Sequence, residues 1–171
     1  MKIQTKNYLD HKIITTHIIK RLVFEKEILL AICEFFYEEL KKNKTSKFEI
    51  TFRNNSRSIQ ESETFKIKSY NKKEVDELKN NIKDYLNREL ISNIQIFYYR
   101  PNPKNYGNSD IIRIDINSSD SFLECKCKMS LESENNQWLN SSFMELDKIL
   151  TKVVKKIITK FFAGLFFLCF F

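Results

Sequence analysis

Three stretches of the chain carry apolar residues at the three- and four-residue spacing of an amphipathic helix. The first runs from Leu22 to about Lys42, the second follows Asn71, and the third follows Ser142 and has no stop signal before the C-terminal segment. We predict a helix in each. Their expected core faces are Leu22, Leu29, Ile32, Phe36 and Leu40; Val75, Leu78, Ile82, Tyr85 and Leu86; and Phe143, Leu146, Leu150, Val153 and Ile157.

The second and third of these helices begin with the sequence of a capping box. Asn71 is followed three residues later by Glu74, and Ser142 is followed by Glu145. A side chain at the N-cap accepts a hydrogen bond from a backbone N–H of the first turn, and the acidic residue reaches back to the cap. We therefore expect Asn71 and Ser142 to be the N-caps.

Five stretches alternate between apolar and polar residues, as expected for strands with one buried face. They are residues 48–52, 59–67, 94–99, 112–116 and 123–129. The stretch 59–67 is the poorest, because Glu61 and Glu63 share the parity of its apolar residues, and inward charge is typical of an edge strand. The last two stretches flank the turn-forming residues 117–120, which predicts an antiparallel hairpin.

The pattern predicts an α+β fold with the element order α-β-β-α-β-β-β-α. We expect a small mixed or antiparallel sheet of about five strands with helices packed on it, followed by an apolar C-terminal helix. The expected domain covers residues 22–156. Residues 1–21 remain an open segment: Ile13, Ile14, Ile18 and Ile19 are compatible with a helix, but no cap marks its start.

Composition and charge change this picture little. The chain has a formal net charge of +7, which favours nucleic-acid or anionic-membrane partners. The chain is rich in Lys, Asn, Ile and Phe and has only two Gly and two Pro, a composition typical of an AT-rich genome. The lysine content is therefore weaker evidence for a polyanionic partner. Residues 1–7 precede no apolar run of about 7–15 residues, so we expect no secretory signal and a cytoplasmic location for the folded part.

The C-terminal segment 157–171 is more apolar than packing requires. A helix of its length reaches only about 22 Å, against about 30 Å for a hydrocarbon core, so we predict a membrane-seeking segment that forms an incomplete transmembrane helix. A buried terminal helix or an oligomer contact is the alternative. The predicted membrane residues are Ile157, Ile158, Phe161, Phe162, Leu165, Phe166, Phe167, Leu168, Phe170 and Phe171.

Lysines lie beside that segment. Lys152, Lys155, Lys156 and Lys160 are the predicted membrane-proximal basic residues. Basic residues next to a membrane segment favour the cytoplasmic side and attract anionic lipids. The alternative is a solvated helix face.

No motif for catalysis, metal or cofactor binding is recognised. Cys125 and Cys127 share one side of a strand, but zinc needs four ligands, and His11 and His17 lie far upstream in a segment where we expect surface residues. The carboxylates Glu61, Glu63, Asp110 and Asp115 are spread over different strands and turns, and Gly107 and Gly164 are too few for a phosphate loop.

Residues 97–100, Phe-Tyr-Tyr-Arg, combine aromatic rings with a cation on one strand, a pattern that can stack the bases of single-stranded nucleic acid. Because successive side chains of a strand point to opposite faces, half of these rings must face the core and cannot stack on a base. Nucleic acid is therefore the less favoured partner. We expect a membrane-anchored cytoplasmic binding or regulatory module that contacts lipid through its C-terminal segment and contacts a protein or a second copy of itself. The alternative is a soluble nucleic-acid-binding protein with an internally packed or dimerising tail.

Overall fold

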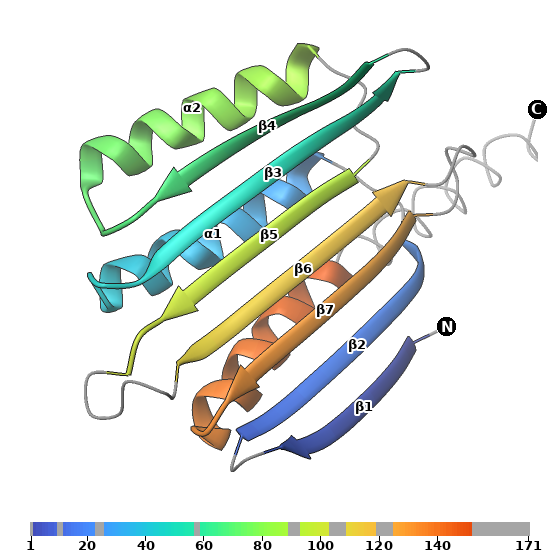
Figure 1. The fold of residues 1–171 in the computed structure, drawn as a ribbon, viewed down its shortest axis with the longest axis vertical. Coiled ribbons are helices and arrows are strands. Elements are labelled where there is room, and N and C mark those ends of the chain that lie inside the picture. The colour runs from blue at the N-terminus through green and yellow to red at the C-terminus, as the bar shows by residue number, and fades with distance from the viewer. Residues whose placement is uncertain are drawn as a thin grey trace, which may run out of the picture.

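The structure, a computed structural model, describes residues 2–9, 12–22, 26–56, 59–88, 93–102, 109–118 and 125–151. These residues form one seven-stranded sheet with helices on one of its faces (Figure 1). All of its strand pairs are antiparallel, which confirms the α+β fold and excludes the mixed sheet.

The strands follow the order β1-β2-β7-β6-β5-β3-β4 across the sheet. Their bounds are β1 Lys2–Leu9, β2 Lys12–Leu22, β3 Lys47–Ser56, β4 Ile59–Ile67, β5 Asn93–Arg100, β6 Asp110–Ser118 and β7 Cys125–Ser133. The predicted strands correspond to β3 through β7, β4 lies at an edge as expected, and β6 and β7 pair as the expected antiparallel hairpin.

The sheet has seven strands where about five were expected, because the N-terminal segment adds β1 and β2. Ile13, Ile14, Ile18 and Ile19 lie on β2 and not on a helix. Thr15 and His17 occupy buried positions of this strand, so its inward face carries polar side chains and the usual apolar–polar alternation is lost.

The helices are α1 Lys26–Lys42, α2 Lys72–Arg88, and a third helix over residues 136–151 that is unlabelled in Figure 1 and coloured orange. Helix α1 starts later than predicted, because Leu22 lies in β2. The predicted cap of α2 is confirmed: Lys73 N donates to Asn71 Oδ1 over 3.0 Å, and Asn71 Nδ2 donates to Glu74 Oε1 over 3.4 Å.

The predicted start of the third helix at Ser142 was wrong. Trp138 N donates to Asn135 Oδ1 over 3.0 Å, and Leu139 N donates to the carbonyl oxygen of Asn135 over 2.9 Å, so Asn135 is the N-cap. Ser142 lies inside the helix, with 4% of its surface exposed. Ser142 and Glu145 have the spacing of a capping box, but they do not cap the helix.

The core lies between the sheet and the helices. Phe36 of α1 packs its ring 5.3 Å from that of Phe48 and 5.4 Å from that of Tyr98, measured between ring centroids. Phe52 stacks at 4.7 Å on Tyr85 of α2. The predicted apolar positions Leu29, Ile32, Phe36 and Leu40 of α1 and Val75, Leu78 and Ile82 of α2 are all buried.

No helix of the described residues covers the opposite face of the sheet (Figure 1). Side chains directly opposite each other on paired strands share one face, so the strand register assigns each side chain to the helix side or to this uncovered side. We call the uncovered side the open face. It comprises Lys12, Ile14, Thr16 and Ile18 of β2; Lys47, Glu49, Thr51 and Arg53 of β3; Ser62, Thr64 and Lys66 of β4; Asn93, Gln95, Phe97 and Tyr99 of β5; Ile111, Arg113, Asp115 and Asn117 of β6; and Lys126, Lys128, Ser130 and Glu132 of β7.

The predicted membrane residues, the segment 157–171, and the predicted basic residues Lys152, Lys155, Lys156 and Lys160 lie outside the described residues. Among the helices of the described ranges, none combines the length and the apolar character that crossing a bilayer requires.

Candidate functional site

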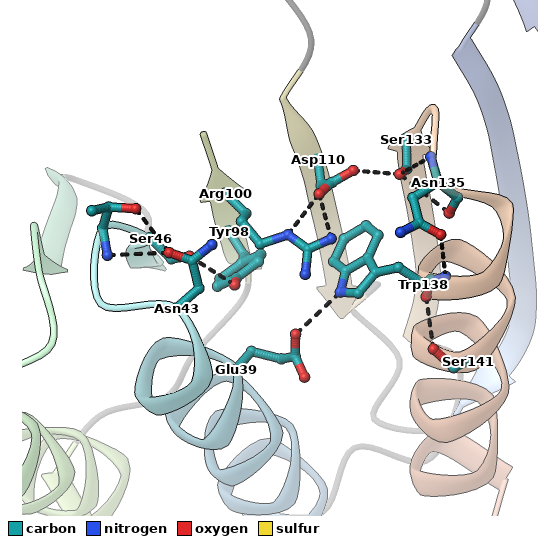
Figure 2. A network of polar contacts seen from close by, with 11 residues as sticks. Glu39, Asn43, Ser46, Tyr98, Arg100, Asp110, Ser133, Asn135, Trp138 and Ser141 are labelled. Atoms are coloured by element: carbon teal, nitrogen blue, oxygen red, sulfur yellow. Dashed lines mark hydrogen bonds and ion pairs between the residues drawn. The ribbon is translucent and has the colours of Figure 1, made fainter. Parts of the chain in front are cut away.

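Two groups of side chains outside the apolar core are organised enough to be considered as sites. One is a polar cluster on the helix side, at the end of the sheet where β5 stops and β6 starts (Figure 2). The other is the centre of the open face. The polar cluster consists of Glu39, Asn43, Ser46, Tyr98, Arg100, Asp110, Ser133, Asn135 and Trp138.

An ion pair stands at the centre of the polar cluster. Arg100 Nε donates to Asp110 Oδ2 over 2.6 Å, and Arg100 Nη2 lies 2.5 Å from the same oxygen. Ser133 Oγ donates to the other oxygen of Asp110, Oδ1. Because Arg100 ends β5 and Asp110 opens β6 directly opposite it, the pair closes this end of the hairpin.

Trp138 connects the ion pair to α1. The guanidinium carbon of Arg100 lies 4.4 Å from the centre of the Trp138 ring, and Figure 2 shows Arg100 between Asp110 and the indole. The indole Nε1 donates to Glu39 Oε2 over 3.1 Å, and Lys42 Nζ donates to Glu39 Oε1 over 2.7 Å. The buried carboxylate of Glu39 therefore joins the third helix to α1, and its hydrogen bond raises the pKa of Lys42.

Tyr98 supplies the deepest contact of the cluster. Its ring is fully buried, and its hydroxyl donates to Ser46 Oγ over 3.0 Å. Burial raises the pKa of Tyr98 to about 12, an effect that outweighs the opposing hydrogen bond to Ser46. Tyr98 is therefore a neutral core residue at physiological pH and not an acid or base.

A cavity of about 420 Å³ opens beside the cluster and is lined by Asn43, Arg100, Pro101, Asn102, Asp110, Glu134 and Asn135. Its charged lining residues are Arg100, Asp110 and Glu134, and the first two are bonded to each other. Arg100 Nε and Nη2 and both oxygens of Asp110 take part in bonds within the cluster, and the guanidinium also lies against the Trp138 ring. The cluster therefore acts as a clamp that holds α1, the third helix and the β5–β6 end together, and it presents no reactive group.

The open face is organised differently, around two aromatic rings. Phe97 and Tyr99 lie two residues apart on β5, with β3 on one side and β6 on the other, and both are half-buried. Each ring is accompanied by a cation from a neighbouring strand. Arg113 of β6 lies 5.6 Å from the centre of the Phe97 ring, and Lys47 of β3 lies 5.8 Å from the centre of the Tyr99 ring.

The charges of the open face are mostly positive. Its cationic residues are Lys12, Lys47, Arg53, Lys66, Arg113, Lys126 and Lys128, and its acidic residues are Glu49, Asp115 and Glu132. Glu49 pairs with Lys66, and Glu132 pairs with Lys12, each over 3.0 Å, while the second oxygen of Glu132 lies 4.0 Å from Arg113 Nη1. Within the described ranges no carboxylate forms an ion pair with Lys126 or Lys128, and both are exposed. The face therefore keeps a net positive charge around the two rings.

The residues 97–100 that the sequence singled out are divided between the two faces. Phe97 and Tyr99 lie on the open face, whereas Tyr98 and Arg100 lie on the helix side and belong to the polar cluster. Arg100 is therefore not the cation that accompanies the exposed rings. Lys47 and Arg113, which take that place, were missed because they come from separate strands, and only the strand register reveals that they are neighbours of the rings.

The expectation that the histidines lie at the surface was wrong for His17, while His11 is outside the described residues. His17 has 3% of its surface exposed. Its Nδ1 lies 3.3 Å from Asp147 Oδ1, and its ring centre lies 5.4 Å from that of Phe143. His17 therefore joins β2 to the third helix.

The cysteines and carboxylates form no reactive group in the described part of the chain. Cys127 is buried in the core, as is Cys33, and burial raises the pKa of the Cys33 thiol to about 12, which makes it a poor nucleophile. Asp110 belongs to the polar cluster and Asp115 to the open face, while Glu63 is exposed on β4. No group of His, Cys, Asp or Glu among the described residues has the arrangement of a metal site.

Comparison with protein-family models, with curated proteins and with solved structures finds no match for the chain.

Proposed function

We propose that this chain is a binding module that its C-terminal segment holds at a membrane, with the open face as its binding surface. The observation that supports the binding surface is the asymmetry of the sheet. Helices cover one face, while the other presents two half-buried rings, each with an exposed cation beside it.

The arrangement of ionisable groups favours binding over catalysis. A catalytic acid, base or nucleophile needs a group that can approach a substrate and change its protonation state near neutral pH. The charged groups of the polar cluster bond to one another, and burial raises the pKa of the Cys33 thiol and of the Tyr98 hydroxyl further above neutral pH. The open face instead offers flat aromatic surface and positive charge, which are means of recognition.

Membrane attachment is supported by the composition of the segment 157–171. Its residues 161–171 comprise six Phe, two Leu, Ala, Cys and Gly, so a helix formed there is apolar on every side. The neighbouring Lys152, Lys155, Lys156 and Lys160 suit the cytoplasmic surface of an anionic bilayer, which would place the folded part in the cytoplasm.

Substitution within the C-terminal segment tests the attachment. In the full chain, Phe161→Ser, Phe162→Ser, Phe166→Ser and Phe167→Ser together remove much of the apolar surface that favours insertion. We expect the unaltered chain in the membrane fraction after cell lysis and this variant in the soluble fraction. The matched control changes the same four residues to Leu and should remain with the membrane.

Two outcomes contradict attachment. One is an unaltered chain that stays in the soluble fraction, and the other is a Ser variant that stays with the membrane as fully as the Leu control. Circular dichroism of the purified variants establishes that the α+β domain is folded in each.

The rings of the open face also favour a second candidate, a soluble nucleic-acid-binding protein whose tail packs internally or forms a dimer contact. The two candidates share the binding surface and differ in the tail. For the soluble protein, the unaltered chain is found in the soluble fraction, and the Ser substitutions lower its stability or its oligomeric state instead of its membrane content.

A further inference from the structure

We propose that the open face binds single-stranded nucleic acid, with Phe97 and Tyr99 as the stacking surface and Lys47 and Arg113 as the flanking phosphate contacts. This inference rests on the part of the proposed function that makes the open face the binding surface. It does not depend on membrane attachment.

The spacing of the two rings favours single-stranded nucleic acid over a duplex. Side chains two residues apart on a strand lie about 6.8 Å apart along it. Neighbouring bases in a duplex are separated by about 3.4 Å along each strand. One base on each ring therefore requires bases that are splayed apart, which a single strand allows and a duplex does not.

The charges beside the rings suit a phosphate backbone. Arg113 stands opposite Phe97 on β6, and Lys47 stands opposite Tyr99 on β3, so each ring has a cation on one flank. Glu49, which stands opposite Phe97 on β3, is paired with Lys66. Lys126 and Lys128 on β7 extend the positive charge beyond β6. This charge complementarity is typical of proteins that follow a single strand with little sequence preference.

Towards the N-terminus of β5, the open-face side chain next to the two rings is polar. Gln95 lies two residues before Phe97 on the same face, and its Oε1 accepts a hydrogen bond from Arg53 Nη2 over 3.1 Å. An amide at this position can hydrogen-bond to the edge of a base that stacks on the neighbouring ring. The strand β5 thus presents an amide and two rings in line.

The position of the cations relative to the rings on the open face favours nucleic acid over a lipid surface as the partner. The cations lie over the rings, and both rings are half-buried. Insertion into a bilayer needs apolar groups that project beyond the charged ones, whereas binding of a single strand combines flat rings with neighbouring cations that can turn toward phosphate.

The test measures binding of the full chain, in neutral detergent, to a fluorescently labelled single-stranded RNA of about 12 nucleotides and mixed sequence. We expect tighter binding to this strand than to a duplex of the same length. Phe97→Leu with Tyr99→Leu keeps the apolar cover of the sheet and should weaken binding about 10-fold or more. Phe97→Tyr with Tyr99→Phe keeps both rings and should bind as the unaltered chain does.

A charge comparison separates a specific surface from general attraction. Lys47→Gln with Arg113→Gln should lower the slope of log affinity against log salt by about 1.4. Lys72→Gln with Lys83→Gln removes the same charge from exposed positions on α2, away from the open face, and should leave the slope nearly unchanged.

Three results would overturn the proposal: no binding of the single strand, equal losses in the open-face and α2 charge variants, or unchanged binding by the Leu variant. Vesicles of phosphatidylcholine with phosphatidylglycerol provide the lipid comparison. If the Leu substitutions reduce vesicle binding but not RNA binding, the open face is a lipid surface and the proposal is wrong. Each of these results leaves the fractionation test of membrane attachment unaffected.

Discussion

Trp138 and Glu39 show how much one side chain of the polar cluster contributes to stability. Phe in place of Trp138 keeps an aromatic ring against Arg100 but removes the Nε1–H that donates to the buried Glu39 carboxylate. Loss of a hydrogen bond to a buried charged acceptor costs about 1–3 kcal/mol. We therefore expect Trp138→Phe to lower the free energy of unfolding by about that amount, as measured by urea denaturation followed by circular dichroism.

The control for this substitution is an ion pair in solvent. Lys41 lies 3.9 Å from Glu38, and their side chains are 62% and 55% exposed. Surface pairs of this kind contribute about 0–1 kcal/mol. If Lys41→Gln destabilises the protein as much as Trp138→Phe does, the polar cluster is not the clamp that its geometry indicates.

The raised pKa values of Tyr98 and Cys33 predict how stability changes with pH. Unfolding restores their ordinary values of 10.0 and 9.0, whereas both are about 12 in the folded state. Above these ordinary values the unfolded chain releases protons that the folded chain keeps, so stability is fully present below about pH 9 and falls as the pH rises toward 12. Each group contributes a loss of about 1.4 kcal/mol per pH unit at most.

Urea denaturation between pH 8 and pH 11 measures this decline. Tyr98→Phe removes one of the titrating groups and leaves the Cys33 thiol and the Tyr37 hydroxyl, whose pKa burial also raises. Its stability should therefore fall less steeply above pH 10, although it starts lower because the bond to Ser46 is lost. Parallel curves for the two proteins would contradict the assignment of the decline to Tyr98.

The contacts of the open-face rings are weak enough to be exchanged. A cation over an exposed ring contributes about 0.5–1 kcal/mol, whereas stacking of a base on an aromatic side chain contributes about 1–3 kcal/mol. A base can therefore displace Arg113 from Phe97, and the freed guanidinium can then contact phosphate.

At the level of the elements, the start of the third helix gives a clear test of capping. Asn135→Ala removes the acceptor of the Trp138 N–H and should lower the free energy of unfolding by about 1 kcal/mol. Ser142→Ala places a good helix former inside the helix and should change stability by about 0.5 kcal/mol or less. Urea denaturation compares the two variants, and an equal or larger effect at Ser142 would contradict the assignment of Asn135 as the cap.

The elements that could be predicted from the sequence are those whose side chains keep a single period. Helix α2 has a cap, an apolar face and no competing pattern, and β3 alternates Phe48, Ile50 and Phe52 with polar residues, so both were predicted correctly. Strand β2 has buried Thr15 and His17, and His17 is accommodated by Asp147 from the third helix. A partner more than a hundred residues away leaves no trace in the local pattern, so β2 was missed.

At the level of the whole molecule, the sequence could predict only part of the candidate site on the open face. The sequence identified the aromatic residues of β5, because they are adjacent in the chain. It could not assign their cations, since Lys47 and Arg113 become neighbours of the rings only through the pairing of β5 with β3 and β6. The strand order, which local patterns do not contain, creates the open face.

The pairing of β2 with β7 has a consequence for the order in which the protein is made. Ile13 stands opposite Ser133 in this pairing, so the N-terminal hairpin leaves the ribosome long before its partner strand is synthesised. Roughly 100 residues separate the two strands, an interval of about 5–20 s at translation rates of about 5–20 residues per second. Throughout that time the isoleucine-rich β2 has an unpaired edge. An unpaired apolar edge favours aggregation, and lysines such as Lys12 and Lys20 of β2 oppose it until β7 emerges.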